Sequence, residues 1–200
     1  MAFLTRFVLL LAVLLAGVAK ADENEVREAS LRATEEGLVL DADIAFELTP
    51  RLAEVLAGGV ALYFAVDFEL VRERWYWLDE KAASARLQMR VSYHPLSRQY
   101  RLSTGLLQRS FDTLDDVLAA MKRVRGWLVV DRTVTFSDAD YEAAVRFRLD
   151  TSLLPKPFQL SAFTARDLQL ETPWRRFTVR SPKHLPAPVE TREPRGSAVR

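Results

Sequence analysis

Pairs of carboxylates are the residues of this chain that come closest to a catalytic pattern. Three pairs of acids are two positions apart: Asp41 and Asp43, Asp67 and Glu69, and Asp138 and Asp140. Residues two apart on a strand share a face, so each pair could converge for general acid and base chemistry. Arginines that follow in the same region offer a different interpretation, cross-strand ion pairing on a solvated face: Arg86, Arg90, Arg98 and Arg101. We favour ion pairing, because charged outer faces are ordinary in antiparallel sheets.

The sequence offers few residues for other kinds of catalytic or metal-binding site. The chain has no cysteine, which excludes thiolate catalysis and Cys-ligated zinc or iron–sulfur clusters, and it has two histidines. His94 is the one that could serve a Ser-His-Asp site, but it precedes Pro95 where we expect a turn, and no Gly-x-Ser-x-Gly motif is present. Asp138-x-Asp140-x-Glu142 is a conceivable calcium loop, but the rest of the EF-hand spacing is absent. We therefore predict no enzyme activity, no cofactor and no metal.

Two features remain as candidates for interaction. Arg146 and Arg148 are two positions apart on an expected strand and could form a small anion site, although pairing with the acidic strands is the simpler expectation. Trp75, Tyr76 and Trp77 are consecutive, so they cannot all enter one core face of a strand. At least one should be exposed, as at a partner site, or covered by another part of the chain.

The N-terminus has the pattern of a secretory signal peptide. Arg6 precedes an unbroken apolar run over residues 7–16, and Ala19-Lys20-Ala21 supplies an A-x-A exit, so we predict cleavage after Ala21. The alternative is an inner-membrane anchor over residues 7–19, but this run is shorter than the about 20 apolar residues that a spanning helix needs. Cleavage would lower the 28 basic residues to 26 against 27 acidic ones, which argues against nucleic-acid binding. Membrane contact is then expected only through an uncleaved signal segment.

The body of the chain, residues 22–180, is predicted to form a single mainly β domain. Apolar and polar residues alternate with a period of two over four segments: residues 38–48, 60–77, 84–94 and 141–149. Their short connections favour an antiparallel meander. Two short helices interrupt it, one over residues 51–57 after Thr49-Pro50, and one capped by Asp112 and closed by Gly126. We predict an antiparallel β-sandwich, Ig-like in general architecture, with seven to nine strands. The proline-rich residues 181–200 are predicted to be a disordered tail.

Four patches of the sequence resemble an exported proteobacterial family, domain of unknown function 4390, some members of which are called proline-rich signal peptide proteins. The patches are residues 59–64 (GVALYF), 75–77 (WYW), 93–100 (YHPLSRQY), and 145–150 (VRFRLD) running into 153–160 (LLPKPFQL). The resemblance spans roughly residues 28–178. It implies an exported proteobacterial protein and transfers no catalytic role. Members are often encoded beside a membrane nitrogen-regulation-type sensor kinase, so the resemblance suggests such a kinase as one partner.

Two functions follow as hypotheses. The first is a non-enzymatic periplasmic adaptor or sensor module that binds an envelope or inner-membrane protein. The second is a periplasmic carrier of a lipid or other apolar ligand, held between the sheets by inward residues such as Phe64, Phe68, Met89 and Phe147.

Overall fold

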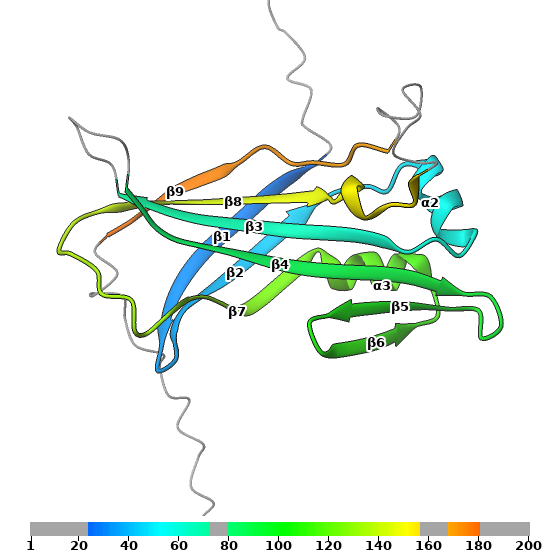
Figure 1. Cartoon of the computed structure of the whole chain (residues 1–200), viewed down its shortest axis with the longest axis horizontal. Coiled ribbons are helices and arrows are strands. Elements are labelled where there is room, and N and C mark those ends of the chain that lie inside the picture. The colour runs from blue at the N-terminus through cyan, green and yellow to red at the C-terminus, as the bar shows by residue number, and fades with distance from the viewer. Residues whose placement is uncertain (1–23, 73–79, 157–167, 181–200) are drawn as a thin grey trace, which may run out of the picture.

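The protein is built from two antiparallel β-sheets that face each other (Figure 1). The structure, a computed structural model, describes residues 24–72, 80–156 and 168–180. The predicted signal peptide, the Trp75-Tyr76-Trp77 run and the predicted tail lie outside these residues. Within the described part the fold is mainly β with two α-helices, which confirms the predicted fold class.

The sheets differ in width. The first has the order β1-β2-β7. Its strands are β1 (Glu25–Thr34), β2 (Gly37–Ala45) and β7 (Arg123–Asp131). The second has the order β6-β5-β4-β3-β8-β9. Its strands are β3 (Leu62–Arg72), β4 (Glu80–His94), β5 (Gln99–Thr104), β6 (Leu107–Phe111), β8 (Tyr141–Leu149) and β9 (Arg175–Val179).

The alternation of the sequence decides which face of each strand is buried. On β3 the even-numbered residues from Leu62 to Leu70 are almost inaccessible, and on β8 the odd-numbered residues from Tyr141 to Leu149 are equally buried. Phe46, Phe64 and Phe147 form the centre of the core, with the rings of Phe64 and Phe147 stacked at 5.5 Å between centroids. Three of the residues that we expected to line a ligand cavity, Phe64, Phe68 and Phe147, are thus packed into the core.

Each of the two helices connects a strand of one sheet to a strand of the other. α2 (Pro50–Ala57) begins as predicted, with Thr49 as its N-cap and Pro50 at its first position. α3 (Leu114–Met121) differs from the prediction at both ends. Its N-cap is Thr113, whose Oγ1 accepts from the Asp116 amide, whereas the Asp112 carboxylate accepts from Gln99.

The expectation that α3 extends to Gly126 is wrong, because residues from Arg123 onward form β7 and pair with β2. Tertiary pairing overrides the helical pattern there, and Val124, Val129 and Val130 also favour a strand. Gly126, with φ of 61°, lies where the β2–β7 register shifts, and its amide donates to Asp41.

Two edge strands were not predicted. β6 and β9 have five residues each, and both are mostly exposed, so neither shows a long apolar alternation. Among the described residues, no helix is both long and apolar enough to cross a membrane.

Candidate functional site

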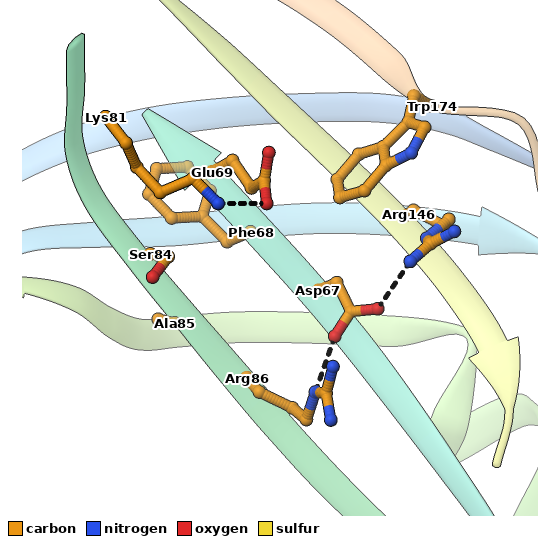
Figure 2. A pocket seen from close by; sticks show the side chains of 9 residues that line it. All are labelled: Asp67, Phe68, Glu69, Lys81, Ser84, Ala85, Arg86, Arg146 and Trp174. Carbon is orange, nitrogen blue, oxygen red and sulfur yellow. Dashed lines mark hydrogen bonds and ion pairs between the residues drawn. The ribbon is translucent and has the colours of Figure 1, made fainter. Parts of the chain in front are cut away.

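Asp67 is the centre of a charge cluster on the outer face of the six-stranded sheet (Figure 2). It lies on β3 opposite Arg86 of β4 and Arg146 of β8, and Arg148 lies diagonally on β8. Its two carboxylate oxygens accept from Arg86 Nε at 2.7 Å, Arg146 Nη2 at 3.1 Å and Arg148 Nε at 2.9 Å. The Asp67 side chain is only 10% exposed, so these are ion pairs of a largely buried carboxylate.

The arginines keep Asp67 ionised. Burial by itself raises the pKa of Asp67, but the hydrogen bonds and charges of Arg148 and Arg86 outweigh burial and hold the pKa below its usual range. Burial lowers the pKa of Arg148, and the bond to Asp67 more than compensates and raises it. Neither group is therefore available as a proton donor or acceptor near neutral pH.

The site residues predicted from the sequence have different partners in the structure. Arg146 and Arg148 share a face as expected, and the carboxylate that they hold is Asp67. Glu69 does not converge with Asp67, and instead its Oε1 pairs with Lys81 Nζ at 2.6 Å. In the pair Asp41 and Asp43, each carboxylate has its own arginine, Arg32 for Asp41 and Arg125 for Asp43. Glu142, the third acid of the conceivable calcium loop, pairs with Arg176.

A shallow pocket lies beside this cluster, and we call it the outer-face pocket (Figure 2). Its volume is about 400 Å³. It is lined by Asp67, Glu69, Lys81, Ser84, Arg86, Arg146 and Trp174, with Phe68 and Ala85 completing it. The Trp174 indole lies over the Arg146 guanidinium, 4.5 Å from its Cζ to the ring centroid. The sequence suggests Trp174 only as a cover for the Trp75-Tyr76-Trp77 run, and it gives no sign of the contact with Arg146, which joins segments 28 positions apart.

A second site arises from the unequal width of the two sheets. β1 contacts β8 and β9, and β7 contacts β4, so the three-stranded sheet covers the inner faces of β9, β8, β3 and β4. β5 and β6 continue the wider sheet beyond β7, where α3 packs against them (Figure 1). Beyond α3, part of their inner face has no opposing strand among the described residues.

This part of the inner face borders a groove of about 280 Å³, with β4, β5 and β6 on one side and β7 and Ala120 of α3 on the other, which we call the inter-sheet groove. Apolar side chains from β4, β5, β6 and β7 line much of it: Leu87, Met89, Leu102, Leu107 and Trp127. Leu107 is 75% exposed, and its neighbour Leu106 at the β5–β6 turn is fully exposed. Large apolar residues gathered at an open groove are typical of a binding surface.

Arginines border the inter-sheet groove and an adjoining hollow of about 750 Å³. They are Arg109 on β6 and Arg123 and Arg125 on β7. Arg125 is bonded to Asp43 at 2.6 Å. Arg109 lies over the Phe111 ring, and neither Arg109 nor Arg123 forms an ion pair with any carboxylate of the described residues. Asp112 and Asp116 lie in the adjoining hollow and already accept hydrogen bonds from Gln99 and Thr113.

The inter-sheet groove also lies between two strand edges. In the described part, β7 pairs only with β2 and β6 pairs only with β5. Each edge strand therefore presents backbone N–H and C=O groups that no described strand satisfies. The alternation of Leu107, Arg109 and Phe111 is the sequence signal on this side of the groove, and three alternating residues are too few to locate a strand.

Metal chemistry gains no support from the geometry. No group of three or more His, Cys, Asp or Glu side chains that could hold an ion occurs in the ranges that the structure describes. His94 is exposed at the end of β4, where the chain enters the turn to β5.

One family comparison matches most of the chain. The model of a domain of unknown function, DUF4390, matches residues 21–178. The chain belongs to this family. The match includes both sheets almost completely and every residue of the two sites. Searches of curated proteins and of solved structures found no match to the chain.

Proposed function

We propose that this DUF4390 protein is an exported, non-enzymatic adaptor that binds an extended acidic segment of an envelope protein in the inter-sheet groove. The observation that carries the proposal is the inner face of β5 and β6 that no described strand covers. A partner strand added to the free edge of β7 would extend the narrow sheet from three strands to four. It would bury the apolar groove residues, as in other cases of recognition by strand addition.

The charges of the groove favour an acidic partner. Arg109 and Arg123 have no carboxylate partner in the described part of the chain, so a bound Asp or Glu would supply one. An alternating segment is needed, because a strand presents every second residue to the same face. We therefore expect apolar residues that face the accessible groove residues Leu87, Leu107 and Trp127, with acidic residues near the arginines.

A carrier of an anionic amphiphile is the second candidate. The same apolar lining and arginines would suit an acyl chain with an acidic headgroup. A lipid would not use the backbone edges of β6 and β7, and this difference favours the protein partner.

Photocrosslinking in cells that export the protein tests the proposal. A photoreactive residue replaces Leu107 in the groove, and in a matched control it replaces Leu96, which is fully exposed at the β4–β5 turn of the same sheet. We expect position 107, but not 96, to crosslink one protein, within an extended segment that contains acidic residues. The substitutions Arg109→Glu and Arg123→Glu together should reduce this crosslink about tenfold or more, because like charges at an interface disfavour binding.

Other outcomes would contradict the adaptor. Crosslinks to lipid alone would support the carrier instead. Crosslinks to another part of the same chain would mean that the groove has an internal occupant. Absence of any crosslink at position 107, or equal capture from positions 107 and 96, would remove the groove as a docking surface.

A further inference from the structure

We infer that the outer-face pocket is a second binding site, and that its ligand is a neutral saccharide. The pocket lies on the face of the six-stranded sheet that points away from the core and from the inter-sheet groove. It combines hydrogen-bond donors, acceptors and an aromatic ring within about 400 Å³, a size typical of small-molecule sites.

The charges around the pocket argue for a neutral ligand. Four cations and four carboxylates around the pocket form ion pairs. Lys81 pairs with Glu69, and Asp67 pairs with Arg86, Arg146 and Arg148. Arg146 also pairs with Glu171, and Arg148 with Asp150. The cluster is therefore electrically balanced. An ionic ligand would add an uncompensated charge to this balanced set, which is costly where groups are partly buried.

Hydroxyl groups can bind such a cluster without breaking it. Each hydroxyl both donates and accepts, so it can bridge a carboxylate and a cation that are already paired. Glu69 and Lys81 are each partly exposed beside the pocket, and Arg86 is 55% exposed with only its Nε bonded to Asp67. The exposed Ser84 hydroxyl lies between them on β4 (Figure 2). A polyhydroxylated ligand would satisfy these remaining donors and acceptors.

Trp174 supplies the apolar part of the site. Arg146 lies against the indole at the wall of the pocket, and the ring points toward the side of the pocket where Glu69 lies (Figure 2). Sugar rings have C–H-rich faces that pack on aromatic rings while their hydroxyls form hydrogen bonds at the edges. Trp provides a large apolar area with little conformational freedom to lose, which suits this kind of contact.

Amide NMR of the nitrogen-labelled full chain tests the inference, with maltose and N,N′-diacetylchitobiose as separate probes. We expect saturable shifts at the amides of Asp67, Glu69 and Ser84 with at least one of the two disaccharides. Trp174→Ala should weaken binding roughly fivefold or more. Ser84→Ala, which removes one exposed hydroxyl, should weaken it less but measurably. Ser92→Ala, on the same face of β4 but outside the pocket, should leave binding unchanged.

Three results would overturn the inference. The first is no shift with either disaccharide. The second is binding that Trp174→Ala and Ser84→Ala leave unchanged. The third is a response at these amides to inorganic phosphate but to neither sugar, which would identify an anion site. Because Ser84→Ala removes only a surface hydroxyl, it remains informative even where Trp174→Ala impairs folding.

Discussion

At the scale of single residues, Asp67 is the side chain on which most of the outer face depends. It is the common acceptor for arginines from two neighbouring strands, and it is mostly buried. Removing its charge leaves Arg146 and Arg148 partly buried with fewer partners. Charge removal of this kind is strongly destabilising, whereas an exposed ion pair contributes little.

We therefore expect Asp67→Asn to lower the free energy of unfolding by about 2–3 kcal/mol at neutral pH. Urea denaturation measures this change. The control is Glu54→Gln, which removes the exposed i,i+3 pair with Arg51 and should change stability by less than about 0.5 kcal/mol. Equal effects of the two substitutions would mean that the Asp67 cluster is no more important than a surface pair.

The stability difference should also depend on pH. The pKa of Asp67 is lower in the folded protein than in the unfolded chain, so folding favours its ionised form. Its contribution is complete above the unfolded value of about 3.9 and is lost as the pH falls through the folded value. The difference between the natural protein and Asp67→Asn should thus be constant near neutrality and shrink below about pH 4. A difference that grows in acid would contradict the assigned direction.

The alternating pattern of a strand predicts which of its residues share a face, but it does not predict which residues of the neighbouring strands lie opposite them. The sequence indicated that Asp67 pairs with arginines and that Arg146 and Arg148 share one face, because a period of two determines the face of a strand. It could not choose among many arginines, since strand order decides which of them lie opposite Asp67. The contacts of Trp174 and Glu171 with Arg146 were not predicted for the same reason, because β9 and the residues before it pair with β8 across a long connection.

At the scale of elements, the turn between β1 and β2 is held by a close approach to β7. Gly37 has φ of 141°, and a Cβ added there would lie 2.1 Å from the Val130 carbonyl oxygen. Backbone atoms cannot move aside as a flexible side chain can. Gly105, at the β5–β6 turn, has φ of 57° but open space around the added Cβ.

The two glycines therefore make a matched comparison. We expect Gly37→Ala to destabilise the protein by about 3 kcal/mol or more, because it combines strain with a backbone clash. Gly105→Ala should cost only about 1–2 kcal/mol from its left-handed backbone. Thermal unfolding of both variants measures the difference. Similar losses would show that the approach of Gly37 to β7 is not a constraint on the fold.

Elements with long alternation were predictable, and the segments between them were less so. The pattern of residues 141–149 predicted β8 with its observed bounds, since both its pattern and its turns are local. α3 was extended too far because Arg123 and Arg125 resemble a basic last helical turn. Pairing with β2 decides their conformation, and that pairing involves residues about 80 positions away.

At the scale of the whole molecule, the main finding is that one sheet is twice as wide as the other. The sequence predicted a sandwich but not this division, because the number of strands in each sheet depends on which edges pair. β6, the strand that makes the wide sheet extend past β7, is short and exposed, so it has no strong pattern. The candidate groove thus follows from topology and could not be located from motifs.

In the proposed complex, a partner strand completes the narrow sheet at the free edge of β7. Amide hydrogen exchange of the protein, alone and crosslinked to its partner at position 107, tests this strand addition most directly. We predict slower exchange at alternate residues of β7 in the complex, because newly bonded amides alternate along an antiparallel edge, with no change at the outer edge of β1. Exchange along β7 that is as fast in the complex as in the free protein would contradict strand addition.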